Sequence, residues 1–245
     1  MMKLKQWGIM YRVYSSFFIG LLGIIWSGAG FTNNTPAPIL TTPMELVEGK
    51  HYQRLKADRV SDPHIQSFLA ENPKTVQVIE FFNYGCAACK WYHPIVGAWA
   101  VKQSATVAFV RVPVIFNKKW ETLAKAYFVT NALSKNDILD TKIFEVIHDR
   151  HTDLSDETLL KKFFAEQGVS EKSFSDLFYS FDMNSKLTKA TTLANAYQVT
   201  LSPVFIVNGP TGSYWITPKM ASTQAELIQI IDQLVARESK QLAGL

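Results

Sequence analysis

Apolar residues recur along the chain with two different periods. Residues 76–84 (VQVIEFFNY) are β-branched or aromatic almost throughout, which is typical of a strand buried on both faces. The run 86–103 places large apolar side chains four residues apart and therefore predicts a helix. Residues 106–115 (TVAFVRVPVI) predict a second strand, so the three elements form a strand–helix–strand unit with parallel strands.

The apolar period becomes helical between residues 118 and 197, which predicts an all-helical region. Beyond it, residues 204–207 and 214–217 predict two strands, joined by turn residues as a hairpin. Residues 222–240 carry one apolar stripe and predict a final helix. The predicted fold class is α/β, with a βαβ half and a ββα half separated by an all-helical insertion.

The amino-terminal residues differ in composition from the rest. Residues 1–29 combine a basic start with an apolar run that ends in small residues, which is typical of a secretory signal peptide. The apolar run also has about the minimum length of a membrane helix, so an uncleaved anchor is the alternative. Residues 30–44 are uncharged and rich in Thr, Asn and Pro, which predicts a linker. Both interpretations export the folded part, which we expect to begin near Glu45.

Composition and charge exclude several classes of protein. The chain has 245 residues, of which 47% are hydrophobic and 19% charged, so it is too apolar to be disordered. Lys3, Lys5 and Arg12 lie in a segment without acidic residues, and the remainder holds 22 basic and 21 acidic side chains. This balance, and the absence of a dense basic run, argue against nucleic-acid binding. The sequence also contains no nucleotide-binding glycine motif.

The two cysteines, Cys86 and Cys89, form a Cys-x-x-Cys pair. A structural disulfide across so short a loop would contribute only about 2 kcal/mol. A zinc site would need a second such pair or a matched histidine pair, and His148 and His151 are distant and too closely spaced. Haem attachment requires a histidine where this chain has Lys90. The pattern therefore favours redox chemistry, with no metal.

The position of the pair gives its two sulfurs different roles. At the start of a helix, amide donors and the positive end of the helix dipole stabilise a Cys86 thiolate. Cys86 is therefore the expected nucleophile. Cys89, one turn further in and more buried, is the expected resolving cysteine.

Several segments together resemble one family. Residues 81–90 (FFNYGCAACK), followed by Pro94, resemble the active-site strand and helix of thioredoxin-like proteins. The helical insertion, the opening 48–52 (EGKHY) and the segment 202–209 (SPVFIVNG) are similar to the DsbA group of bacterial thiol/disulfide oxidoreductases. The resemblance implies a thioredoxin-like fold whose first part spans 45–117, whose insertion spans 118–197 and whose second part spans 198–245.

The resemblance also implies roles for individual residues. The proline that corresponds to Pro203 is cis in such proteins and faces the cysteines, and the residue before it, here Ser202, pairs with substrate.

Glu80 is a carboxylate within an apolar strand, and if buried it is a candidate proton shuttle for Cys89. The alternative is that Glu80 pairs with Arg111 on the neighbouring strand.

The chain departs from the group at the dipeptide between the cysteines. The group commonly has Pro-His there, whereas Ala87 and Ala88 offer neither a donor nor a charge. We therefore expect the pKa of Cys86 to be lowered less than in the strongest oxidants, whose thiol reaches about 3.5. His93 lies one turn beyond Cys89, where we expect it on the helix surface.

The sequence thus predicts a periplasmic thiol:disulfide interchange protein that introduces disulfides into exported, cysteine-containing proteins. We expect a monomer with no cofactor besides the cysteine pair. The resemblance implies a DsbB-type membrane protein as the reoxidant. Two alternatives remain open: a disulfide isomerase or reductase of the same fold, and a chaperone-like peptide-binding module in which the cysteines are incidental.

Overall fold

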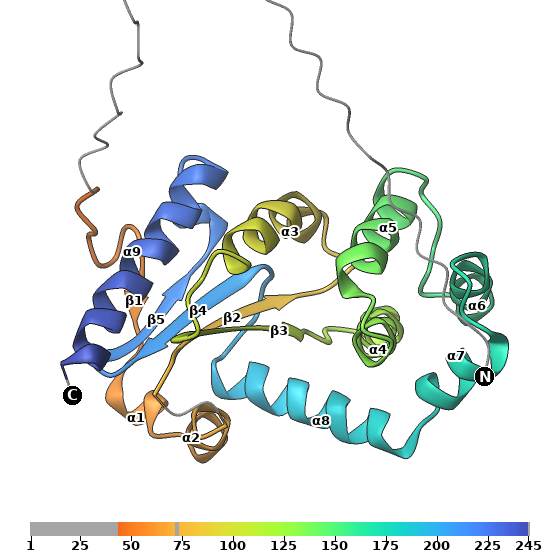
Figure 1. Ribbon diagram of the computed structural model, residues 1–245, viewed down its shortest axis with the longest axis horizontal. Helices are drawn as coiled ribbons and strands as arrows, with labels where there is room; N and C mark the ends of the chain where they lie inside the picture. Colours follow the sequence, from red (N-terminus) through yellow and green to blue (C-terminus); the bar gives the residue numbers. More distant parts are fainter. Residues whose placement is uncertain (1–43, 72–73, 245) are drawn as a thin grey trace, which may run out of the picture. The chain divides into compact units, whose positions relative to one another are not determined.

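A five-stranded sheet forms the centre of the computed structural model, which describes residues 44–71 and 74–244 (Figure 1). The strand order is β1-β5-β4-β2-β3. β2 and β3 are parallel, whereas β4 runs antiparallel to both β2 and β5, and β1 is antiparallel to β5. The strands are β1 (Gln53–Arg54), β2 (Val76–Phe82), β3 (Val107–Pro113), β4 (Val204–Gly209) and β5 (Gly212–Ile216).

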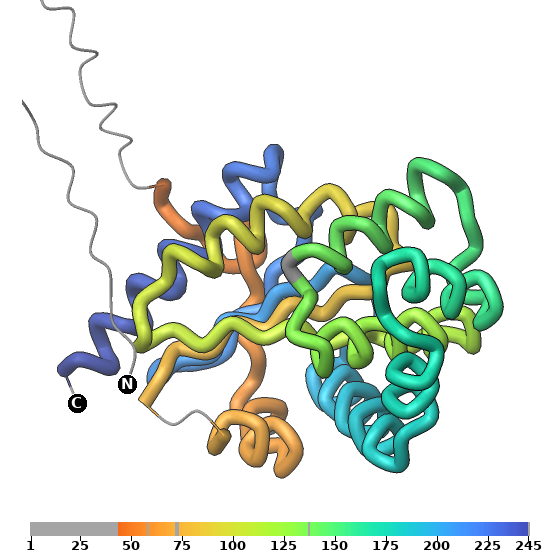
Figure 2. Tube along the Cα trace, turned by 45° about the vertical axis from the view of Figure 1, so that its right-hand side comes forward, coloured from red at the N-terminus to blue at the C-terminus, as the bar shows by residue number. Residues whose placement is uncertain are grey.

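Helices cover both faces of this sheet. α3 (Ala87–Ala100) and α9 (Gln224–Ala243) lie on one face, and α2 (Pro63–Leu69) and α8 (Phe181–Ala196) lie on the other (Figures 1 and 2). The remaining helices are α1 (Ala57–Val60), α4 (Lys118–Ala132), α5 (Asn136–His148), α6 (Glu157–Glu166), α7 (Glu171–Phe178) and the short 3-10 helix η1 (Pro218–Met220). None of the helices in the described part of the chain is long and apolar enough to cross a membrane.

Strand β2, which lies between β4 and β3, contributes side chains to three apolar cores. Its side chains alternate between the faces, so Val78 packs toward α3 and α9 while Ile79 packs toward α2 and α8. The end of β2 enters a third core within the helical insertion, where Phe82 packs with Leu123 and Phe144. Every residue of β2 is buried, as its nearly continuous apolar pattern predicts.

The predicted fold class is confirmed: β2-α3-β3 is the βαβ unit, β4-β5-α9 is the ββα unit, and α4 to α8 separate them. The ends of the helices and strands differ from the predicted ends by a few residues. β2 ends two residues earlier than predicted because the Asn83 side chain accepts from the Gly85 amide and turns the chain. The pattern did not predict β1, α1, α2 or η1, which are short. The predicted signal or anchor and nearly all of the predicted linker lie outside the described residues.

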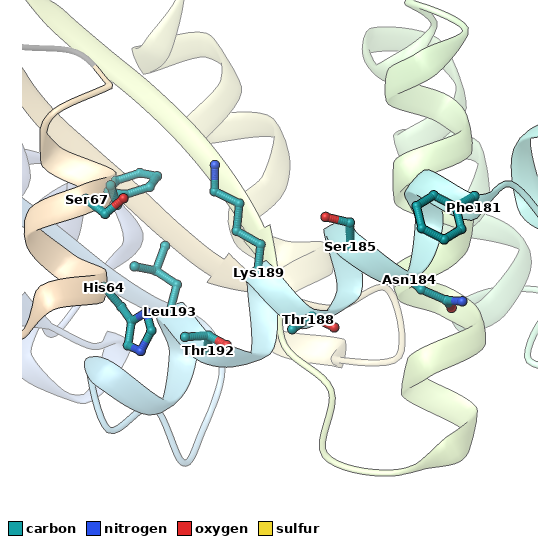
Figure 3. Close-up of a pocket in the computed structure, with 10 residues that line it drawn as sticks. His64, Ser67, Phe181, Asn184, Ser185, Thr188, Lys189, Thr192 and Leu193 are labelled. Atoms are coloured by element: carbon teal, nitrogen blue, oxygen red, sulfur yellow. The ribbon is translucent and has the colours of Figure 1, made fainter.

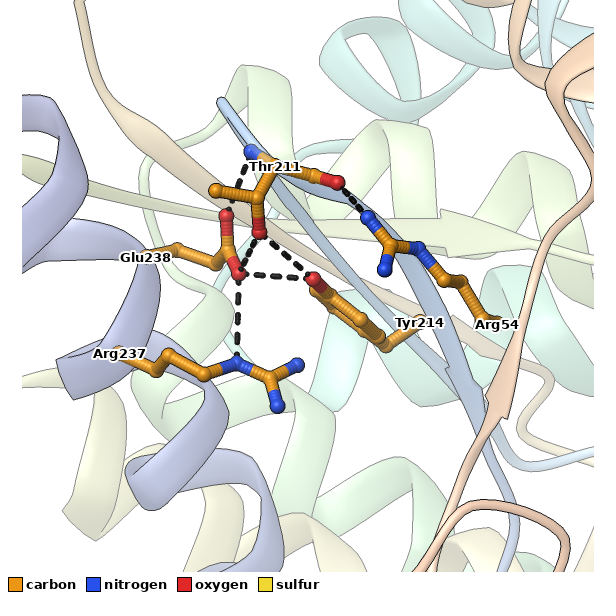
Figure 4. A network of polar contacts seen from close by, with 5 residues as sticks. All are labelled: Arg54, Thr211, Tyr214, Arg237 and Glu238. Carbon is orange, nitrogen blue, oxygen red and sulfur yellow. Dashed lines mark hydrogen bonds and ion pairs between the residues drawn. The ribbon is translucent and has the colours of Figure 1, made fainter.

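The β4–β5 hairpin is fastened to α9 by a buried carboxylate (Figure 4). Glu238 accepts hydrogen bonds from the amide and hydroxyl of Thr211, at 2.8 and 2.6 Å, and from the hydroxyl of Tyr214 at 2.8 Å. Burial raises the pKa of Glu238, but these hydrogen bonds outweigh it and leave the pKa below its usual range. The close approach requires a glycine at 209, because a Cβ there would lie 2.4 Å from the Cβ of Glu238.

Candidate active site

Four residues, 83–86, connect β2 to α3, and side chains and backbone from several elements hold them in place. Asn83 donates through Nδ2 to the carbonyls of Val114 (2.9 Å) and Trp120 (3.1 Å), and its own carbonyl accepts from the Cys86 amide (3.0 Å). Tyr84 is buried and donates its hydroxyl to Asp140 of α5. Gly85 passes close to Trp120, whose Nε1 would lie 2.9 Å from a Cβ at this position. The segment therefore fixes where α3 begins.

Cys86 is the N-cap residue of α3. Its sulfur accepts from the Cys89 amide at 3.2 Å, as the oxygen of a serine cap would. Cys86 is 8% exposed, whereas Cys89 is fully buried. Both are free thiols. The pair thus has one sulfur that a reactant can reach and one that it cannot.

Hydrogen bonds give Cys86 an acidic thiol. Donation from the Cys89 thiol is the largest influence, and burial opposes it. Further donation from the Ser202 side chain and from the amides of Cys89 and Ala88 brings the pKa of Cys86 down to about 6. A pKa of about 6 is below the ordinary 9, but well above the value of about 3.5 known for a strong oxidant of this kind. This agrees with the expectation from the Ala87–Ala88 dipeptide.

The pKa of Cys89 is shifted in the opposite direction. Burial raises the pKa of its thiol strongly, and the Cys86 sulfur and the charge of Glu80 raise it further. Near neutral pH, Cys89 is therefore protonated while Cys86 is largely ionised. Such a pair has a partly accessible nucleophile and leaving group beside a protected resolving thiol, which is the arrangement that reversible disulfide exchange requires.

The loop before β4 lies against the reactive sulfur. The Ser202–Pro203 peptide bond is cis, as the resemblance implies. The Ser202 carbonyl oxygen lies 3.4 Å from the Cys86 sulfur, within reach of a thiol donor. β4 starts directly afterwards and pairs antiparallel with β2, which brings this distant segment to the start of α3. The structure thereby gathers four of the predicted site residues: Cys86, Cys89, Ser202 and Pro203.

Glu80 forms the ion pair that the alternative interpretation proposed. It lies directly opposite Arg111 in the β2–β3 register, and Arg111 Nε donates to its carboxylate at 2.8 Å. Burial raises the pKa of Glu80, while the charge and the hydrogen bond of Arg111 act in the opposite direction. The charge of Glu80 also contributes to the raised pKa of Cys89. The ion pair is present, and the proton-shuttle role remains a prediction.

The expectation that His93 lies on the helix surface is wrong. Its ring is half-buried, with its centroid 5.2 Å from that of Phe144 in α5, because α5 covers this side of α3. Burial, and then the charge of Arg111, lower the pKa of His93 to about 3. A neutral imidazole offers no positive charge to Cys86, so it does not replace the histidine that the family commonly has between its cysteines.

Sequence reasoning did not find the contribution of α5 to this site. Asp140 and His148 both bond to Tyr84, and Asp149 pairs with Lys90, the residue after Cys89. These residues are fifty or more positions from the cysteines and match no motif. Only the spacing of eight residues between Asp140 and His148 hints that both lie on one face of a helix.

Comparison with known proteins identifies the family. The family model described as a DSBA-like thioredoxin domain matches residues 97–226. The thiol:disulfide interchange protein DsbA of Azotobacter vinelandii is 30% identical over 219 residues, which cover 89% of this chain and 96% of that one.

The chain belongs to the DsbA family. The protein of the same name from Pseudomonas aeruginosa is 31% identical over 166 residues, covering 68% of this chain and 77% of that one. The crystal structure of Pseudomonas aeruginosa DsbA superposes with a TM-score of 0.69 and 29% identity, over 82% of this chain and 97% of that one. The match to the family model begins after the cysteines, at residue 97. As a DsbA family member with this pair, the protein is a thiol/disulfide oxidoreductase.

A separate groove lies between α2 and α8 (Figure 3). It has a volume of about 540 Å³ and ends at the exposed Phe181. All of its lining residues come from these two helices, on the sheet face opposite α3. The groove is therefore no part of the redox site.

We expect alkylation of the reduced protein by iodoacetamide to follow the ionisation of Cys86, with a midpoint near pH 6. Cys89 should remain unmodified in the folded protein because its thiol is buried and its pKa is raised. A pH–rate series with mass spectrometry of the modified site measures both. A midpoint near the ordinary pKa of 9, or modification of Cys89 first, would contradict the assignment.

The same shift predicts how the stability of the reduced protein depends on pH. The pKa of Cys86 is lower in the folded than in the unfolded chain, so its ionisation stabilises the fold fully above pH 9. This contribution decreases as the pH falls toward about 6 and is absent below it. The Cys86→Ala variant should lack this part of the pH dependence in urea unfolding.

Proposed function

We propose that this protein introduces disulfide bonds into exported, cysteine-containing proteins in the bacterial periplasm. One observation carries the proposal: the more accessible sulfur, that of Cys86, has the lowered pKa, and the fully buried sulfur of Cys89 has the raised one. A reduced pair stabilised in this way gives up its electrons reluctantly, and the oxidised pair accepts them readily. The curated relatives are named for thiol:disulfide interchange, which supports disulfide exchange at this pair.

The reaction proceeds by two exchanges at sulfur. A client thiolate attacks Cys86 of the oxidised pair, the Cys86–Cys89 bond breaks, and the Cys89 sulfur leaves with the electron pair and takes up a proton. A second client thiolate then attacks the client sulfur of the mixed disulfide, and Cys86 leaves as a stabilised thiolate. The client has lost two electrons and the pair has gained them. The pair itself is the proposed redox group, with no further cofactor.

Ser202 and Pro203 are the proposed client-binding positions. They lie beside the Cys86 sulfur at the start of β4, where an extended client segment would reach backbone groups. We further propose export by the amino-terminal signal, with residues 1–29 as an inner-membrane anchor in the alternative case. The resemblance to DsbA supports a quinone-linked DsbB-type membrane protein as the partner that restores the disulfide. The proposed state in solution is a monomer.

Cys86→Ser and Cys89→Ser should separate catalysis from binding. With oxidised wild-type protein, reduced unfolded ribonuclease A should gain disulfides and activity, and Cys86→Ser should lose this completely. With scrambled ribonuclease, whose disulfides the Cys86 thiolate can attack while the displaced client sulfur leaves as a thiol, Cys89→Ser should instead stay attached as a mixed disulfide, because the resolving thiol is missing. Gel shift under non-reducing conditions and ribonuclease activity measure these outcomes.

The alternatives give different results in the same experiment. Failure of the wild type to oxidise the reduced client, together with unchanged protection of an unfolding client from aggregation by Cys86→Ser, would favour a peptide-binding module. Faster reshuffling of scrambled ribonuclease than oxidation of the reduced form would favour an isomerase. Either result would overturn the proposed oxidase function.

Glu80 is the proposed proton shuttle for Cys89, and its pairing with Arg111 determines how this should be tested. A single Glu80→Gln change would leave a buried cation without its partner, which costs about 3–5 kcal/mol. The double variant Glu80→Gln/Arg111→Gln removes both charges and should regain most of that stability. If Glu80 carries the proton, the folded double variant should react with client thiols at least about tenfold more slowly. An unchanged rate would assign Glu80 a purely structural role.

A further inference from the structure

Tyr84, two residues before Cys86, is held by α5 at both of its polar ends. Its hydroxyl donates to the Asp140 carboxylate. Its backbone carbonyl lies 2.7 Å from Nε2 of His148, two turns further along the same helix. A carbonyl oxygen only accepts hydrogen bonds, so Nε2 of His148 carries a proton and donates it.

This carbonyl belongs to the segment that determines where Cys86 lies. The Asn83 side chain, in the same segment, also has its partners. It donates to the carbonyls of Val114 and Trp120 and accepts a hydrogen bond from the Gly85 amide. Tyr84 is only 1% exposed. If the His148 donor is lost, water can therefore reach the Tyr84 carbonyl only if the surrounding segment moves. A buried carbonyl left without a partner costs about 1–3 kcal/mol. The histidine therefore acts on the backbone one peptide unit away from the N-cap.

The His148 ring is itself fixed. It stacks on Phe144, with an interplanar angle of 26°, and Phe144 in turn packs against the Tyr84 ring at 5.1 Å. The next residue, Asp149, pairs with Lys90 on the other side of the cysteines. Two consecutive residues at the end of α5 thus contact the chain before Cys86 and after Cys89.

We propose that His148 is a positioning residue for the redox pair, which holds the Tyr84 carbonyl so that Cys86 stays at the N-cap of α3. The inference rests on the proposed function, because it assigns a role in tuning the same pair. It gives a role to the histidine at the end of α5, which neither the zinc nor the haem interpretation of the sequence accounts for.

The expected effect falls on the reduced state alone. The Cys86 thiolate depends on donors from Cys89 and Ala88, whose placement follows the start of α3. The oxidised pair has no thiolate to stabilise. Loss of the His148 donor should therefore raise the pKa of Cys86 and make the pair a weaker oxidant.

His148→Met and His148→Gln form a matched pair of variants, because the side chains have similar lengths and only glutamine donates a hydrogen bond. At pH 7, His148→Met should lower the equilibrium constant for oxidation of glutathione by the pair about three- to tenfold. A tenfold change corresponds to about 30 mV for two electrons. It should also raise the Cys86 pKa, measured from thiolate absorbance. His148→Gln should restore both quantities to within twofold of the wild type. The exposed His64→Gln, on α2, is the control and should change neither.

Two results would overturn the proposal: unchanged redox values in His148→Met, or equal changes in the methionine and glutamine variants. If His148→Met does not fold, the shorter His148→Leu takes its place in the same comparison with His148→Gln. The Cys86 titration needs no client protein, so its outcome stays separate from a failure of the wild type to oxidise ribonuclease.

Discussion

The structure depends on one interaction above all: a sulfur at the N-cap of a helix, surrounded by donors that favour its ionised form. Cys86 receives hydrogen bonds from Cys89 and from the backbone of the first turn of α3. Such donors act without a formal positive charge, which matters here because Ala87 and Ala88 supply none. The resulting acidity is moderate, and it makes Cys86 both the sulfur that clients attack and the better leaving group.

The βαβ unit, the ββα unit and the helical insertion contribute different parts of the redox site. The βαβ unit places the cysteines at the end of a buried strand, and the ββα unit brings Ser202 and Pro203 to the same sulfur. The helical insertion covers the pair from the side and bonds to the segment just before it through α4 and α5. The insertion is therefore part of the redox site and not only a cover.

Much of this was predictable from the sequence, for identifiable reasons. Continuous apolar runs and regular helical spacing fixed the class of the fold, and a Cys-x-x-Cys pair after a strand fixed the place of the chemistry. Short elements such as β1 and α1 escaped because they carry too few residues to show a period. The burial of His93 and the contacts of His148 escaped because they depend on how α5 packs on α3, which local pattern does not encode. Glu80 was recognised as unusual and its pairing with Arg111 was one of two alternatives from the sequence; the strand register and the contact between the two side chains show that the ion pair forms.

The reduction potential of the Cys86–Cys89 pair, measured by equilibration with glutathione, tests the account most directly. Stabilisation of the Cys86 thiolate predicts an oxidising potential. The absence of a charged residue between the cysteines predicts that it stays below that of the strongest oxidant. The expected value therefore lies above about −200 mV but below about −120 mV. A value near −270 mV, typical of thioredoxin, would contradict the claim that this geometry makes the protein an oxidant.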